Sequence, residues 1–200
     1  VMPAFADENI GCVAGRLVYV DDANSTVGKG AQSYWGYETF VKMAESRACS
    51  LIGASGCLYA VRRSAYEPMY AEACSDFLIC TLLYRKGLRT VFEPDAVCFE
   101  ETNRDPGDEL QMRVRVIVQT LTDLWRNRDM LNPLKSGCFA IELVSHKLLR
   151  YLVPLLLLML LAANAALAAS SAFYSITLAI QAAFYLMAFC GWLLERFGRR

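Results

Sequence analysis

An uncharged stretch covering residues 151–194, 44 residues in all, constrains the fold of this 200-residue chain more than any other feature. As a helix, which rises about 1.5 Å per residue, it would be about 65 Å long, roughly twice the thickness of a bilayer's hydrocarbon core. Ser170 and Ser171 divide it into residues 151–169 and 172–194, each about as long as a membrane-spanning helix. The sequence therefore predicts a transmembrane hairpin rather than one buried helix of a soluble domain.

Basic residues flank this stretch at both ends. Lys147 and Arg150 precede the first span, and Arg196 and Arg199 follow the second. The positive-inside rule then places both flanks in the cytoplasm and the turn between the spans outside. The spans follow the polar part of the chain, unlike a secretory signal, which precedes it. We expect a multi-pass protein of the inner (plasma) membrane, with residues 1–147 in the cytoplasm and the lipid bilayer as a partner.

Charge balance and cysteine spacing exclude other classes of protein. The 20 basic and 20 acidic residues cancel, and no basic stripe with interleaved aromatic residues is present, so nucleic-acid binding is not expected. The 8 cysteines form no C-x-x-C pair and show no zinc-ligand spacing. In a reducing cytoplasm they are expected to be small apolar residues, and no metal site is predicted in this chain.

The polar part alternates between strand-like and helix-like patterns. Successive predicted elements are a strand at 11–20, a turn at 21–25, a helix at 32–50, a loop at 52–56, a strand at 57–61, a helix from Asp76 to Gly87, strands at 89–92 and 96–99, and a helix at 108–127. Gly87 is predicted to be a left-handed C-cap, and Pro94 to separate two short edge strands. Strands that alternate with helices ahead of a membrane anchor indicate an α/β domain.

Several short sequence blocks occur in a fixed order along the chain. They are Tyr34-Trp-Gly-Tyr-Glu38, Gly53-Ala-Ser-Gly56, Tyr59-Ala-Val-Arg-Arg63, Ser75-Asp-Phe77, Gly87-Leu-Arg-Thr-Val91 and Glu93-Pro-Asp-Ala96, followed by Leu131-Asn-Pro133 and Ser145-His-Lys147. In this order they resemble the bacterial membrane-embedded family-2 glycosyltransferases, which include the synthases of cellulose, hyaluronan and poly-N-acetylglucosamine. The resemblance covers essentially the whole chain.

The resemblance implies a fold and a division into segments. Residues 1–130 would be the carboxy-terminal part of a Rossmann-like catalytic domain of the GT-A type, and residues 131–150 an interfacial amphipathic segment. The spans at 151–169 and 172–194 would be the first transmembrane hairpin. The chain is expected to lack the half of the domain that binds the sugar nucleotide.

The implied activity is that of an inverting glycosyltransferase. A sugar would pass from a nucleotide-diphosphate sugar to a growing polysaccharide or a lipid-linked acceptor at the cytoplasmic membrane face. The family holds Mg²⁺ or Mn²⁺ with a D-x-D motif, which we expect upstream of Val1, because Asp21-Asp22 has neither its spacing nor its strand-end position. This chain alone is therefore expected to bind no metal and to be inactive. The alternative, from a different class, is a non-catalytic membrane scaffold or subunit with a glycosyltransferase-like domain.

The resemblance also assigns a catalytic base and an acceptor site. Asp76 matches the aspartate that takes the proton of the acceptor hydroxyl, a task that needs a positioned carboxylate. The alternative for Asp76 is a helix N-cap. Gly53, Ser55 and Gly56 match the acceptor-binding segment, where small residues let a sugar ring approach the backbone. Their alternative is an ordinary turn into the next strand.

One arginine is assigned to the donor diphosphate. Arg115 takes the place of the arginine in the family's Q-x-x-R-W element, although the flanking residues of that element differ here. A guanidinium group suits a departing diphosphate because it offers several donors and a permanent charge. The alternative is that Arg113 and Arg115 are solvated on the polar face of an interfacial helix, which we favour for Arg113.

Overall fold

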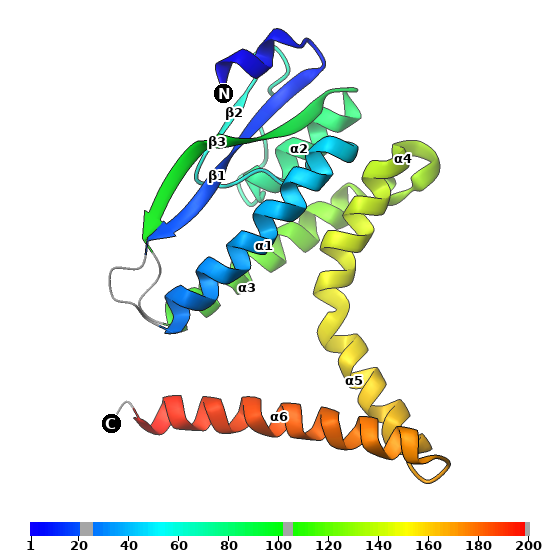
Figure 1. Ribbon diagram of the computed structural model, residues 1–200. Coiled ribbons are helices and arrows are strands. Elements are labelled where there is room, and N and C mark those ends of the chain that lie inside the picture. Colours follow the sequence, from blue (N-terminus) through cyan, green and yellow to red (C-terminus); the bar gives the residue numbers. More distant parts are fainter. Residues whose placement is uncertain (21–25, 102–105, 199–200) are drawn as a thin grey trace. The chain divides into compact units, whose positions relative to one another are not determined.

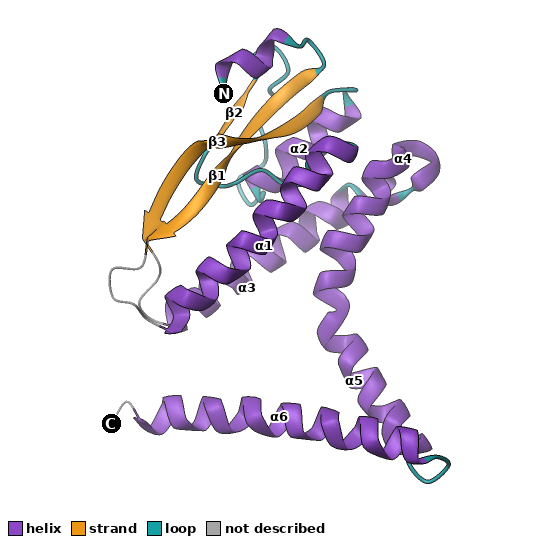
Figure 2. Ribbon diagram, viewed as in Figure 1, coloured by secondary structure: helices purple, strands orange, loops and turns teal. Residues whose placement is uncertain are grey.

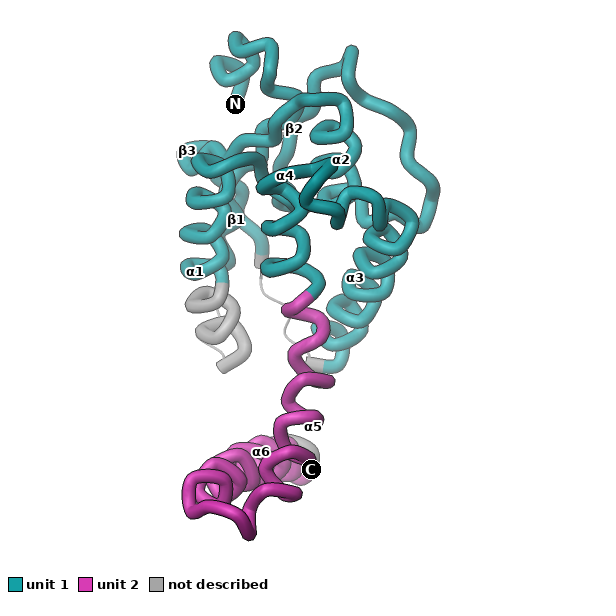
Figure 3. The backbone as a smooth tube through the Cα atoms, turned by 90° about the vertical axis from the view of Figure 1, so that its right-hand side faces the viewer, with its two compact units in different colours: residues 1–148 teal, residues 149–200 magenta. Residues whose placement is uncertain are grey.

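The computed structural model describes residues 1–20, 26–101 and 106–198, which form two compact units, residues 1–148 and 149–200 (Figures 1 and 3). Unit 1 contains a small mixed sheet with helices, and unit 2 consists of long helices (Figure 2). The predicted α/β class is confirmed for unit 1. The predicted turn at 21–25 lies outside the described residues.

The sheet of unit 1 has three strands in the order β2-β1-β3. The central strand β1 (Ile10–Val20) pairs antiparallel with β2 (Tyr59–Val61) and parallel with β3 (Arg89–Glu101). Its middle is apolar on both faces, because Cys12, Val13 and Ala14 are completely buried. A strand buried on both faces reads as a continuous apolar run, as this one does.

β3 corrects the prediction of two short strands. It is one strand of 13 residues at the edge of the described sheet. Its register against β1 jumps between the pairs Glu93 with Gly15 and Val97 with Arg16, so residues 94–96 bulge out of the ladder. Pro94 has no N–H to donate, which explains why the ladder is interrupted there without ending.

Helix α2 (Ser75–Arg85) packs against the sheet and confirms the predicted helix in this region. Its residues Ile79, Cys80 and Leu83 share a core cluster with Cys12 and Ala14 of β1. Past its end, Gly87 has φ +78°, and the Leu88 N–H bonds back to the Leu83 carbonyl. This is the predicted left-handed C-cap.

α1 and α3 are helices, as predicted from the sequence, but their first and last residues differ somewhat from the predicted ones. α1 is Thr26–Ala48 and α3 is Pro106–Arg126. Leu110 and Val114 of α3 are exposed, whereas Leu124 is buried. Buried with Leu124 are two polar residues, Thr120 and Asp123, for which the apolar pattern gave no signal.

The segment predicted to be interfacial contributes one face to the core of unit 1. After the 3₁₀ turn η2 (Arg128–Leu131) come α4 (Pro133–Glu142) and the π-helical turn η3 (Leu143–Leu148). Phe139 and Leu143 join the second core cluster with Phe77, and the Phe139 ring stacks on Tyr84 with centroids 4.2 Å apart. Leu134 and Ile141 on the same segment remain exposed, so the segment is amphipathic.

Unit 2 contains α5 (Leu149–Leu167) and α6 (Ala172–Gly198). The helical runs Pro133–Leu167 and Ala172–Leu194 are long and apolar enough to cross a membrane, judged by length and composition. The two helices of unit 2 contact each other, and most of their large apolar side chains are exposed. The predicted pair of apolar helices is confirmed, and their membrane insertion remains a prediction.

Candidate active site

Asp76 is the second residue of α2 and lies in its first turn. The N-cap position belongs to Cys74, so the N-cap interpretation of Asp76 is wrong. One carboxylate oxygen, Oδ1, accepts hydrogen bonds from the Phe77 N–H at 3.0 Å and from the Cys74 thiol at 3.1 Å. The first turn of a helix favours a negative charge, because free N–H groups and the helix dipole point there. The half-buried carboxylate is therefore fixed in the first turn of α2 by two hydrogen bonds to Oδ1.

The loop containing Gly53 and Gly56 lies directly beside Asp76. The Ala54 N–H donates to the Asp76 carbonyl at 2.9 Å. A Cβ atom placed on Gly56 would lie 3.4 Å from the second carboxylate oxygen, Oδ2. The structure thus brings together the predicted base and the predicted acceptor loop, which are about 20 residues apart in sequence. Gly56 is exposed, so the Asp76 carboxylate lies close to solvent on the side of this glycine.

The hydroxyl of Ser55 is engaged within the protein, and the predicted part of Ser55 in acceptor binding stays a prediction. The side chain is buried, and its Oγ donates to the Gly15 carbonyl at 2.7 Å. The same Oγ accepts from the Lys42 ammonium at 3.0 Å. Ser55 therefore links the loop to β1 and to Lys42.

Two lysines reach this loop, and the sequence analysis did not assign either to the site. Lys42 on α1 is 7% exposed, and its pKa is lowered mainly by burial, while the charge of Glu38 opposes the shift. Lys147, in the Ser145-His-Lys147 block, has its Nζ 3.5 Å from where a Gly53 Cβ would lie and 5.5 Å from the ring centre of Phe77. Both ammonium groups bring positive charge to the side of the loop. The only available sequence signal was the block that contains Lys147.

Asp123, also missed in the sequence, fixes the residue that begins α2. It is completely buried, and its Oδ2 accepts from the Cys74 N–H at 2.9 Å, while the Tyr70 hydroxyl donates to Oδ1. Burial raises the pKa of this carboxyl, and the two hydrogen bonds act in the opposite direction. The Arg126 guanidinium lies over the Tyr70 ring, 4.1 Å from its centre. Helix α3 thereby holds the amino-terminal end of α2, and with it Asp76.

The two candidate arginines of α3 lie on different sides of the helix. Arg113 precedes the buried Thr120 by two helical turns and so shares its face, whereas Arg115 is rotated by about 200° from Arg113. Arg113 forms an ion pair with Glu109 at 2.7 Å. Arg115 is exposed. The role predicted for Arg115 stays a prediction, while helical spacing places Arg113 on the side of α3 that carries the buried Thr120.

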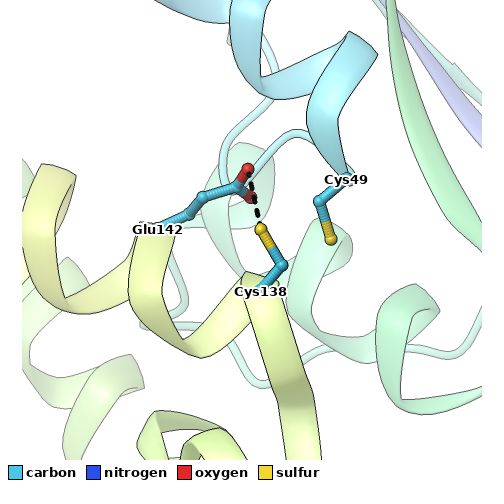
Figure 4. Close-up of side chains that lie close together, drawn as sticks. All are labelled: Cys49, Cys138 and Glu142. Carbon is cyan, nitrogen blue, oxygen red and sulfur yellow. Dashed lines mark hydrogen bonds between the residues drawn. The ribbon is translucent and has the colours of Figure 1, made fainter.

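A separate group of potential metal ligands lies between the end of α1 and α4 (Figure 4). The ligand atoms of Cys49, Cys138 and Glu142 all lie within 4.8 Å of one another. Burial, followed by the charge of Glu45, raises the pKa of Glu142 to about 7. Sequence spacing could not reveal this group, because Cys49 follows the end of α1 and lies about 90 residues from Cys138 and Glu142 on α4.

Comparison with known proteins found no match, neither with a protein-family model nor with a curated protein. The resemblance to family-2 glycosyltransferases therefore rests on the sequence blocks alone.

Proposed function

We propose that this chain is the carboxy-terminal part of an inverting, membrane-embedded glycosyltransferase. The observation that carries the proposal is the position of Gly56 beside the Asp76 carboxylate at the start of α2, where a Cβ atom on residue 56 would lie 3.4 Å from Oδ2. Two blocks that the family would use for acceptor binding and for proton removal are adjacent in space. The apolar helices α5 and α6 support placement at a membrane.

In the proposed reaction, Asp76 takes the proton of an acceptor hydroxyl as its oxygen attacks the anomeric carbon of the donor sugar. The bond from that carbon to the diphosphate breaks as the new glycosidic bond forms. Gly53 and Gly56 leave room for the acceptor ring, and the nucleotide-diphosphate sugar enters from the part of the protein that precedes this chain. Arg115, or Arg113 by the geometry of α3, would hold the departing diphosphate.

The surroundings of Asp76 do not fit a divalent metal. Lys42 and Lys147 supply positive charge near the loop, and the buried carboxylate of Asp123 is occupied by Tyr70 and Cys74. We therefore propose that the Mg²⁺ or Mn²⁺ of the reaction is held by residues outside this chain. It would supply charge neutralisation of the diphosphate, and no role of a described residue depends on it.

The test is the substitution Asp76→Asn in the full protein that contains this chain, assayed in membranes with radiolabelled nucleotide sugars. Turnover should fall about 100-fold or more, because the amide cannot accept the proton, while donor affinity should be retained. Asp129→Asn is the matched control, since that exposed carboxylate lies in η2, paired with Arg85. Unchanged turnover in Asp76→Asn would remove the base from the proposal and favour the non-catalytic scaffold.

A further inference from the structure

We propose that Cys49, Cys138 and Glu142 form a binding site for a thiophilic divalent cation of the zinc type. The site is independent of the proposed transferase activity and of the metal that this activity would use. It would join the end of α1 to α4 through the ion.

The geometry of the group needs little change to hold such an ion. Cys138 and Glu142 are one helical turn apart on α4, with the thiol sulfur 3.9 Å from the carboxylate Oε1. Cys49 follows directly after the last residue of α1 and supplies the second sulfur within 4.8 Å. The two sulfurs and the oxygen around a tetrahedral zinc ion are about 3.6–3.8 Å apart, given Zn–S and Zn–O bonds of about 2.3 and 2.1 Å. The distances between the ligand atoms would have to shorten by about 1 Å at most to coordinate the ion, which rotation of the side chains can supply.

An unsatisfied buried carboxylate is the independent sign that a ligand belongs here. Glu142 is 7% exposed, and its Oε2 has no hydrogen-bond partner in the part of the chain that the structure describes. Among the described residues, its Oε1 accepts a hydrogen bond only from the Cys138 thiol, which is a weak donor. The neighbouring buried carboxylate of Glu45 is already paired with His146, whose Nδ1 lies 2.5 Å away. A buried carboxylate without a counter-charge is costly, and a cation between the two thiols and Glu142 would remove that cost.

The ligand set selects the class of ion. Two thiolates with one carboxylate are softer than the all-oxygen sets preferred by Mg²⁺ and Ca²⁺, and suit Zn²⁺. Binding would form two metal–sulfur bonds and release the two thiol protons to solvent, with no change of oxidation state. Cys138 is exposed and Cys49 half-buried, so an ion can enter from solvent. Three protein ligands leave a fourth position for water.

The experiment uses the whole chain, purified in detergent with a phosphine reductant and freed of metal by a chelator. Titration with Co²⁺ should give one equivalent of tetrahedral ion, seen as sulfur-to-cobalt charge-transfer absorbance in the near ultraviolet, and Zn²⁺ should displace it. Cys49→Ser and Cys138→Ser should each weaken binding by about 100-fold or more, and Glu142→Gln by about 10-fold or more. The matched control is the double substitution of Cys57 and Cys98 by serine, another neighbouring thiol pair, which should bind as wild type.

Glu142→Gln also guards against a variant that fails to fold, since it removes the buried charge and should leave the metal-free protein at least as stable. Zn²⁺ should raise the melting temperature of the wild type and not that of Glu142→Gln. Absence of charge-transfer absorbance in the wild type, or its persistence in Cys49→Ser or Cys138→Ser, overturns the proposal. The proposal is also overturned if the reduced protein does not bind Zn²⁺ and Cys49 and Cys138 instead form a disulfide in air.

Discussion

Replacing Asp123 with alanine removes the acceptor that holds the start of α2 against α3. In the wild type its carboxylate accepts the Cys74 N–H and the Tyr70 hydroxyl, and none of the side chain is exposed. Alanine leaves both donors without this partner, and water reaches the Cys74 amide poorly because Cys74 is 7% exposed. The perturbation is therefore an unpaired donor next to the proposed base, together with a small cavity.

An unsatisfied buried donor costs about 1–3 kcal/mol and a small cavity adds about 1–2 kcal/mol, so Asp123→Ala should lower the free energy of unfolding by about 2–5 kcal/mol. For a chain of this size each kcal/mol moves the melting temperature by about 2–4 °C, which gives a decrease of roughly 4–20 °C. Asp123→Asn should cost only about 1 kcal/mol. Its amide oxygen can accept from Cys74, and its amide nitrogen can donate to the Tyr70 oxygen.

Thermal unfolding of the whole chain in detergent, followed by circular dichroism with and without chelator, measures these shifts. Asp129→Asn serves as control, because its exposed ion pair with Arg85 should contribute less than about 1 kcal/mol. If Asp123→Ala melts within about 1 °C of the wild type, or if Asp123→Asn is as damaging as alanine, the account of this carboxylate as a paired acceptor fails.

Three further predictions concern the loop, the arginines and the topology. Gly56→Ala should change the free energy of unfolding by less than about 1 kcal/mol, since its Cβ would meet Asp76 at an ordinary 3.4 Å, yet it should lower turnover. Gly15→Ala should instead destabilise the protein by about 1–3 kcal/mol, because its Cβ would lie 2.5 Å from a β3 carbonyl oxygen; melting curves and transfer assays would separate the two effects. Arg115→Ala should reduce turnover more than donor affinity if the sequence register holds, and the same result with Arg113→Ala instead would assign the diphosphate to Arg113. A cysteine introduced at Ser171 should react with an impermeant maleimide in intact cells above the wild-type background, and protection from the reagent there would reverse the predicted orientation.

Much of the fold could be predicted because its signals are local. The uncharged stretch determines the two apolar helices, and Gly87 determines the end of α2 through the backbone conformation that follows the last helical turn. The long β3 could not be predicted, since Pro94 reads as a break when its neighbours in the sheet are unknown. The bulge at this proline becomes visible only from the register with β1.

Only those residues of the site that belong to the sequence blocks could be predicted. Asp76 and Gly56 belong to sequence motifs, and the structure places them side by side. Lys42 and Asp123 lie on helices where a single charged residue ordinarily indicates a solvated face. Their burial depends on contacts made across the chain, to Ser55 and to Cys74, and no spacing rule encodes such contacts.

The polar contacts inside unit 2 bear on how its helices would enter a bilayer. Asn164 of α5 donates to Gln181 of α6 at 3.2 Å, Thr177 donates to Asn164 at 3.2 Å, and Gln181 donates to the Leu157 carbonyl at 2.8 Å. In hydrocarbon each such contact is worth about 0.6–2 kcal/mol, and an amide on a lone helix would lack its partner. The two helices would therefore be inserted most favourably as a preassembled pair rather than one after the other. Gln181→Leu would make α6 more hydrophobic and easier to insert alone, while removing the contact that sets its crossing point on α5.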